Sequence, residues 1–519
     1  MFRPLASSAL ALMVGAAPVF ADVTPEQVWQ HLASYYDRVG YQVSVGAQDD
    51  SGDQLVLSDV VIGTGEDAQP ALTITMPRIT LSRTGDARVR TVFDDDIGVL
   101  VAGAMPEWDD PDLNLTLSMP GNQMTSSGSP EELLHEFDYP SLEVSVDLPD
   151  IPQDEGHVSL TLGQLQGSQT TSLNGQLDTS YDMTAASMVF AMGFAEPDQP
   201  EEGPGNGRLT LEMDIADLAL VGQFSAPEGE IDLGADLSGA LKAGMVSDSK
   251  LTMGQMTGRL DFIDSDDDDG DDNGGEKFFS ALFTAESSGL EMDMSRDGIS
   301  YRSESGPTQV EASSHDLPIP INFGIGSVSG ALQMPFEKSD QPQPFSLSYE
   351  IADLTMGDDI WSLFDEEGHL PRDPAGLAID LEGQLLLQQD LFDPEFGMQP
   401  DSDEPQEMTA DEMPILPQSV TFNRLALNAA GASAEVTGEL DLTGNLQEPV
   451  GRIDGSFSGI DGLMNNLIAM GVVPQEQAMG LRMMLAMFTQ TVEGDPDRLE
   501  TQLEFREGGA IFANGQQVK

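Results

Sequence analysis

Cysteine is missing from this chain altogether: none of its 519 residues is Cys. Without thiols the protein can have no disulfide bonds, thiolate catalysis, iron–sulfur clusters or zinc–thiolate sites. Basic residues are scarce as well, since 21 Lys and Arg stand against 90 Asp and Glu and give a formal net charge of −69. Such a negative surface repels polyanions. We therefore expect no nucleic-acid partner.

Recognisable catalytic motifs are also missing. The sequence has neither a G-x-x-x-x-G-K-[ST] phosphate-binding loop nor a G-x-S-x-G nucleophile turn. Ser247 and Lys250 match an S-x-x-K pattern without its K-T-G partner, which we interpret as chance. The histidines lack metal-ligand spacing; they are His31, His135, His157, His315 and His369. We predict that the protein is not an enzyme.

The first residues have the pattern of an export signal. A short cationic start that contains Arg3 leads into an apolar run at residues 5–14, and small residues precede Ala21. Gly15 and Pro18 interrupt the run, so it is too short to anchor the chain in a membrane. We predict a signal peptide at residues 1–21, cleavage after Ala21, and a periplasmic protein without a transmembrane anchor.

The hydrophobic period then separates helices from strands. Thr24, Pro25 and Gln27 have the spacing of a capping box, and apolar residues at helical spacing predict a helix up to Val39. After that helix, alternating apolar and polar residues predict half-buried strands. These lie at 41–46, 54–62, 71–82, 142–148, 158–165, 209–215, 230–242, 251–263, 278–285, 345–352, 377–388, 420–428, 434–442 and 499–506.

Near the end of the chain the period becomes helical again. Residues 461–470 and 474–490 predict a helical hairpin, with Gly471 between the two helices and Pro474 at the first turn of the second. The second helix is apolar almost all round, so it needs a covering surface. We expect the C-terminal strands to cover it. The alternative is a removable contact with a ligand or partner, which flexible Met side chains would suit.

Together these elements predict a mainly β protein. One apolar face on strand after strand favours a large curved antiparallel sheet, arranged either as a meander with a groove or in two layers, with an N-terminal helix and a C-terminal helical hairpin. We predict four segments, of which the third is an acidic, Pro-rich linker or loop. The segments are the signal peptide (1–21), a β-rich body (22–392), the linker (393–417) and C-terminal strands with the hairpin (418–519).

The sharpest local motif is an acidic run at residues 264–276. Oxygen-bearing side chains at alternate positions around Gly270 resemble a calcium-binding loop, although Ser265 stands where such a loop begins with Asp. The flanking segments predict strands, so a solvated hairpin tip is the alternative. The candidate ligands for calcium, which is the one cofactor that the sequence suggests, are Asp267, Asp269, Asp271, Asn273 and Glu276.

Several short motifs carry a resemblance to a known family. They are the segments DIWSLFD at 359–365, LPRDP at 370–374, MGVVP at 470–474, MGLRMM at 479–484 and FANGQ at 512–516, with ADVTPEQVW at 21–29. With these motifs the chain resembles the alphaproteobacterial family catalogued as domain of unknown function 2125. The resemblance implies an exported envelope protein and supplies no activity, ligand or catalytic residue. The strand-rich layout is also loosely similar to AsmA-like envelope proteins, which form long curved sheets with an apolar inner groove.

Two functions follow from these patterns. The first is non-catalytic binding or scaffolding in the cell envelope, in which an apolar sheet face meets a lipid or an envelope protein. The alternative is a hydrolase that acts on envelope polymers through carboxylates, supported only by the abundance of Asp and Glu.

The export signal gives a direct prediction. The mature protein should begin at Asp22, because a signal peptidase reads the small residues before it. Intact-mass measurement of the protein from a periplasmic fraction checks this; a mass that still includes residues 1–21 would contradict it.

Overall fold

The computed structural model describes residues 23–64, 71–103, 112–148, 156–195, 207–227, 237–264, 277–315, 317, 319–393, 413–442 and 447–519. All 28 strands of the described residues belong to one antiparallel sheet. The predicted mainly β fold with a large antiparallel sheet is therefore confirmed, in its single-layer, groove-like form.

The N-terminal part of the sheet carries one helix. Its elements are α1 (Pro25–Arg38), β1 (Gln42–Asp50), β2 (Gln54–Gly63), β3 (Ala71–Arg83), β4 (Val89–Phe93), β5 (Ile97–Ala102), β6 (Leu113–Ser118), β7 (Gln123–Ser129), β8 (Glu132–Asp147) and β9 (Gly156–Ser172).

The middle of the sheet alternates long strands with pairs of shorter ones. Its elements are β10 (Leu177–Ala195), β11 (Arg208–Ala226), α2 (Leu237–Ala243), β12 (Val246–Met253), β13 (Met256–Asp264), β14 (Lys277–Ala285), β15 (Ser288–Ser295), β16 (Gly298–Ser305), β17 (Thr308–Ser314), β18 (Ile321–Ile325), β19 (Ser327–Met334) and β20 (Gln343–Met356).

The C-terminal part ends in the two predicted helices. Its elements are α3 (Asp358–Phe364), β21 (Ala375–Leu387), β22 (Ile415–Ala429), β23 (Ala432–Asp441), β24 (Val450–Ser458), α4 (Ile460–Ala469), α5 (Gln475–Phe488), β25 (Gln490–Val492), β26 (Asp495–Arg506), β27 (Ala510–Ala513) and β28 (Gln516–Gln517). β21 precedes the predicted linker at 393–417, β22 begins within its last residues, and the two strands pair directly with each other.

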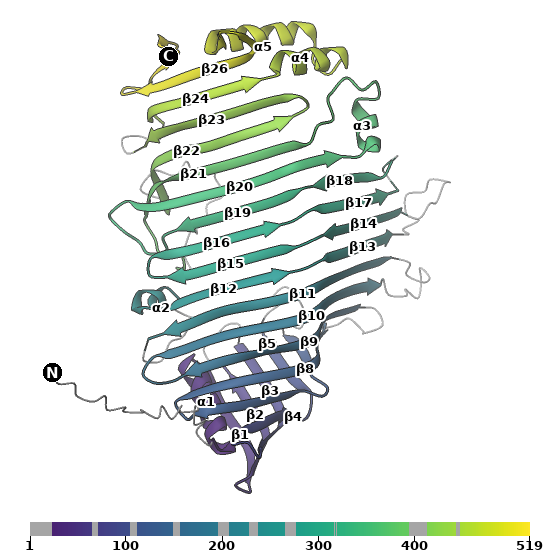
Figure 1. The fold of residues 1–519 in the computed structure, drawn as a ribbon, viewed down its shortest axis with the longest axis vertical. Helices are drawn as coiled ribbons and strands as arrows, with labels where there is room; N and C mark the ends of the chain where they lie inside the picture. Colours follow the sequence, from purple (N-terminus) through teal and green to yellow (C-terminus); the bar gives the residue numbers. More distant parts are fainter. Residues whose placement is uncertain are drawn as a thin grey trace, which may run out of the picture.

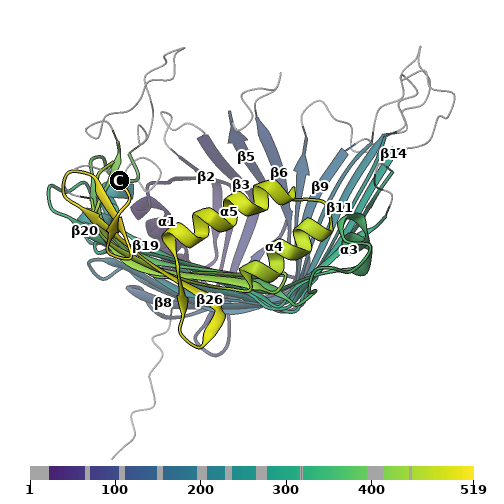
Figure 2. The same ribbon diagram turned by 90° about the horizontal axis from the view of Figure 1, so that it is seen from above.

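The sheet forms a long trough. In Figure 1 the strands lie across the long axis of the molecule, in an order that largely follows the sequence. Figure 2, which looks along that axis, shows the sheet curved into a U with α1 inside it and with α4 and α5 across the C-terminal end. Some rows of the sheet consist of one long strand, whereas in others two shorter strands lie end to end. For example, β11 pairs with both β12 and β13.

A line of irregular positions, here named the crease, crosses the sheet where the long strands bend. Four long strands each have one residue in the left-handed backbone conformation at this line; they are Asp59, Gln164, Asp217 and Asp353. At Asp59 the side-chain alternation shifts by one: Leu55 and Leu57 are buried before it, and Val60 and Ile62 after it. Both halves of the strand therefore present apolar residues to the same face, although the strand bends between them.

Glycines on the neighbouring strand leave space for the crease. Gly46 lies opposite Asp59, and a Cβ atom there would come within 2.9 Å of the Asp59 Cβ. Gly326, between β18 and β19, would bring a Cβ within 2.8 Å of the Asp353 Cβ. The crease in the long strand β20 thus lies beside the junction where the shorter strands β18 and β19 meet end to end.

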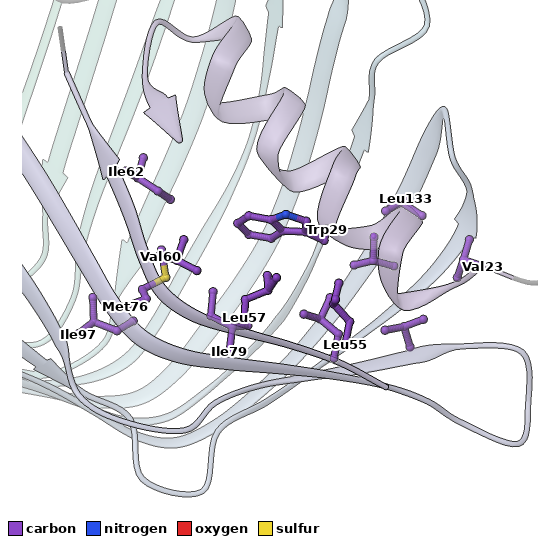
Figure 3. Packing of buried hydrophobic residues seen from close by; sticks show 13 residues of the cluster. Val23, Trp29, Leu55, Leu57, Val60, Ile62, Met76, Ile79, Ile97 and Leu133 are labelled. Atoms are coloured by element: carbon purple, nitrogen blue, oxygen red, sulfur yellow. The ribbon is translucent and has the colours of Figure 1, made fainter. Parts of the chain in front are cut away.

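The N-terminal end of the trough is filled by α1. Its predicted capping box is present: the Gln27 backbone N–H donates to Thr24 Oγ1 at 3.2 Å, and the Thr24 N–H donates to Gln27 Oε1 at 3.0 Å. Trp29 and Val28 pack onto the inner face of the first strands and form the largest buried cluster (Figure 3). This cluster fixes α1 inside the curve of the sheet.

Two predictions about individual elements are wrong. Within the predicted strand at 230–242, residues 237–243 form the helix α2, because Ala240 and Leu241 are buried in a small cluster with Met245 and Phe336. The helix predicted at 474–490 is present as α5, but the C-terminal strands do not cover it.

Most large side chains of α5 are exposed. Met483 is 68 % exposed, and only Ala478 is buried. The two helices of the hairpin are held together by Arg482, which donates to Asn465 Oδ1 at 2.7 Å and lies 3.3 Å from the Asp461 carboxylate. The alternative expectation, a removable contact with a ligand or partner, stays a prediction.

The crease predicts a stability difference between two glycine substitutions. Gly326→Val should lower the free energy of unfolding by about 1–3 kcal/mol, because the new side chain overlaps Asp353. Gly98→Val is the matched control, since a Cβ at Gly98 in β5 meets nothing within 4 Å. Urea unfolding of both variants measures the difference; equal losses would show that the crease does not need glycine.

Candidate functional site

One face of the sheet is apolar along the whole trough. Residues directly opposite each other on paired strands point to the same side of the sheet. The face that contacts α1 can therefore be followed from strand to strand through the paired residues. From Met183 the face continues to Leu220, Leu251 and Leu290. Further along, Leu332, Leu347, Leu381 and Phe422 lie opposite one another. Because α1 lies inside the U, this apolar face is the concave one.

The inner face carries no charge in its central part. Away from the crease and the strand ends, the described inner-face positions from β10 to β24 hold apolar or aromatic residues, Gly, Ser and Thr, with the uncharged Gln343 as the exception. Several large side chains there are open to solvent instead of being packed into a core; they are Phe262, Met292, Tyr301, Leu347, Tyr349, Met356 and Leu427. An exposed apolar surface of this length is typical of a binding surface.

The outer face is mainly polar and acidic. Glu291 in β15 accepts from Lys250 at 2.6 Å and from Arg302 at 2.9 Å, and Arg452 lies 2.7 Å from Asp454 in the next-but-one position of β24. A shallow hollow of about 670 Å³ on this face includes Arg452, which is already paired. The scarce cations therefore mainly neutralise neighbouring acids, and the two faces of the sheet differ sharply in polarity.

A more enclosed pocket of about 440 Å³ lies between α1 and the inner face of β2–β10. Trp29, Leu32 and Tyr36 line it from the helix, and Phe137 and Met183 are among the residues that line it from the strands. Burial raises the pKa of the nearby Tyr139 hydroxyl to about 12, with a smaller contribution from Tyr36. The pocket is thus an apolar site at the end of the trough that α1 fills.

Two buried histidines in the lining of this pocket lie close to each other. His31 on α1 and His135 on β8 are each 3 % exposed, and their ring centroids are 6.2 Å apart. His135 Nδ1 lies 2.8 Å from Ser126 Oγ, but its Nε2 has no hydrogen-bond partner within the described residues. Neither ring nitrogen of His31 makes a hydrogen bond of standard geometry there, although the Thr171 backbone is near enough to raise its pKa.

Burial keeps both imidazoles neutral. Desolvation, helped by the neighbouring His31, lowers the pKa of His135 to about 4. Desolvation also lowers the pKa of His31; the Thr171 backbone acts in the opposite direction, and Arg38 adds to the lowering. The sequence does not connect these two residues, because 104 positions separate them and only the placement of α1 inside the trough brings them together.

The predicted calcium ligands Asp267, Asp269, Asp271, Asn273 and Glu276 lie outside the described residues. Within the described residues, no group of three or more His, Asp and Glu side chains is arranged to hold a metal ion. Calcium binding therefore stays a prediction. The described helices include none with the length and apolar character needed to cross a membrane.

The motif at residues 359–374 has a structural explanation. Asp365, which is almost fully buried, follows α3 and accepts from the backbone N–H groups of His369 and Leu370, each at 2.8 Å. Burial alone would raise the pKa of Asp365, but these two hydrogen bonds together with the His369 side chain outweigh it and hold the pKa below its usual value. Arg372 lies over the Trp361 ring, 5.6 Å from its centre. The motif thus fixes the turn between α3 and β21.

Comparison with known families matches the C-terminal part of the trough. Residues 283–513 match the family model DUF2125, described as an uncharacterized protein conserved in bacteria. Over these residues the chain is similar to the DUF2125 family. The predicted resemblance is therefore confirmed for the DUF2125 region, which begins in β14, ends in β27 and includes α3, α4 and α5. The pocket beneath α1 lies outside the DUF2125 region.

Searches among curated proteins and among solved structures found no match to the chain. The alphaproteobacterial origin and the AsmA-like similarity stay predictions.

The buried histidines predict a pH dependence of stability. The unfolded chain binds a proton at His135 near pH 6.5, whereas the folded protein does so only near pH 4. The unfolded state is therefore favoured as the pH falls between these values, by up to about 3 kcal/mol. Relative to wild type, His135→Asn should gain stability as the pH falls from 7 to 4. Thermal melting measures this difference, with the exposed His157→Asn as control; parallel curves for wild type and His135→Asn would contradict it.

Proposed function

We propose that this is an exported periplasmic protein that binds a lipid, or another molecule with a long apolar part, along the inner face of the trough. The protein would act as a carrier or scaffold and not as a catalyst. The observation that supports this proposal most directly is the exposure of large apolar side chains on the concave face, from Phe262 to Leu427.

The shape of the site favours an extended ligand. Opposed apolar residues repeat from row to row along the trough, and adjacent rows are about 4.8 Å apart. A linear hydrocarbon chain lying along the trough would contact several rows at once. Burying apolar area contributes about 25 cal/mol per Å², so many weak contacts along the chain would add up to a useful affinity.

The charge distribution supports the same function. The acidic outer face keeps the protein in solution despite its apolar trough. The uncharged inner face requires no desolvation of ions when an apolar ligand enters. The alternative hydrolase function stays a prediction, and no specific contact among the described residues favours it.

Charges placed inside the trough should abolish binding of a phospholipid probe. Met292 and Leu347 are 40 % and 38 % exposed on the inner face, so Met292→Glu with Leu347→Glu should leave the fold intact. A fluorescent NBD-labelled phosphatidylethanolamine should bind this double variant at least tenfold more weakly than wild type, because each carboxylate would have to lose water.

The matched control carries the same two substitutions on the outer face. Val189 and Val221 are 37 % and 48 % exposed there, so Val189→Glu with Val221→Glu adds equal charge at similar exposure. This control should bind the probe like wild type. The proposal is wrong if wild type does not bind the probe, or if both double variants lose binding equally.

A further inference from the structure

We propose that the pocket beneath α1 binds a long-chain carboxylic acid, whose carboxyl group lies between His31 and His135. This inference goes beyond the proposed trough function, because it assigns a second site and a specific polar group to its ligand. It rests on the placement of unpartnered polar atoms in a largely apolar enclosed pocket.

The unpartnered atoms are concentrated at this pocket. Among the described residues, six buried side-chain nitrogen and oxygen atoms make no hydrogen bond in the structure, and four of these six belong to His31, Thr91 and His135. All three residues line the pocket. A buried polar group without a partner typically costs about 1–3 kcal/mol. Such a cluster is therefore explained by a bound polar group.

The wall around these atoms selects a ligand that is mainly hydrocarbon. Leu81, Phe93, Phe137 and Leu165 contribute apolar surface to the pocket. Its volume of about 440 Å³ is near the lower end of the range for small-molecule sites, roughly 300–1,000 Å³. This size suits a single alkyl chain better than a two-chain phospholipid. Met183 lines the pocket and lies opposite Leu220, so the apolar surface continues from the pocket into the trough.

The histidines offer the hydrogen bonds that a carboxyl group needs. With the Ser126 hydroxyl donating to His135 Nδ1, the proton of this neutral imidazole is on Nε2, which becomes a donor. Neutral His31 offers one donor and one acceptor. A carboxylic acid can accept from one imidazole N–H through its carbonyl oxygen and donate its O–H to the acceptor nitrogen of His31. The group then enters without adding net charge to the pocket.

Water alone satisfies these atoms less well. A buried water is stable when it makes two to four hydrogen bonds to polar neighbours, and most of this pocket is apolar. A carboxyl group brings its own apolar chain, which fills the remaining volume and excludes water from it.

The test uses the full chain and the fluorescent fatty acid cis-parinaric acid, with its methyl ester as the probe that lacks the acidic O–H. Wild type should bind the acid at least tenfold more tightly than the ester. The variant His31→Phe with His135→Phe should lose this preference and bind the acid at least tenfold more weakly than wild type. Without any probe, its melting temperature should rise, because the unpartnered polar atoms have been replaced by apolar ones.

His157→Phe is the control on an exposed histidine and should leave binding of the acid unchanged. The proposal is overturned if wild type does not bind cis-parinaric acid, if acid and ester bind alike, or if the double His variant binds the acid as wild type does. The trough variant with Glu at positions 292 and 347 should still bind cis-parinaric acid. Failure of the trough proposal and failure of the pocket proposal therefore give different results.

Discussion

The constraint on which this architecture depends is that a bent strand must keep its apolar side chains on one face. A strand alternates strictly, so a bend that inserts an irregular residue normally sends the following side chains to the wrong side. At Asp59 and Asp353 a single left-handed residue combines the bend with a shift in alternation. Pairing Asp59 with Gly46 removes the clash that this backbone would otherwise make. Curvature and an unbroken apolar lining therefore come from the same positions.

The open trough has an energetic consequence. In an ordinary domain the apolar face of a sheet is covered by a second layer, and that contact supplies most of the stability. Here such a core exists chiefly beneath α1, where Val28 and Trp29 are buried. Elsewhere the backbone ladder and contacts between neighbouring side chains along the strands hold the sheet together. The central rows thus retain apolar surface that is free to interact with another molecule.

Much of the fold could be predicted from the sequence, because it is governed by local patterns. The capping box at Thr24 and the alternation around residues 209–215 identify α1 and β11 without tertiary information. The helix α2 could not be recognised, since the apolar residues Leu237 and Leu241 also fit an alternating strand and their burial depends on Phe336, almost a hundred residues away. The exposure of Met483 on α5 could not be predicted either, because a hydrophobic pattern does not reveal whether another element covers the helix.

The candidate sites illustrate the same limit. The apolar trough follows from strand alternation and was predicted as a surplus apolar face. The histidine pair was not, because no spacing rule connects His31 with His135 before the first helix is placed inside the sheet. Burial, which decides the protonation of these rings, is a property of the fold and not of the local sequence.

Because strands pair only with those in adjacent rows, rows can be added or removed, and the length of the trough can change. Each strand contacts chiefly its two neighbours, as in proteins built from stacked repeats, so a change in one row leaves distant rows unaffected. Inserting a hairpin of two strands would lengthen the lining by about 10 Å while preserving α1 at one end and the α4–α5 hairpin at the other. Adding or removing hairpins would therefore change the length of the trough with no redesign of either end.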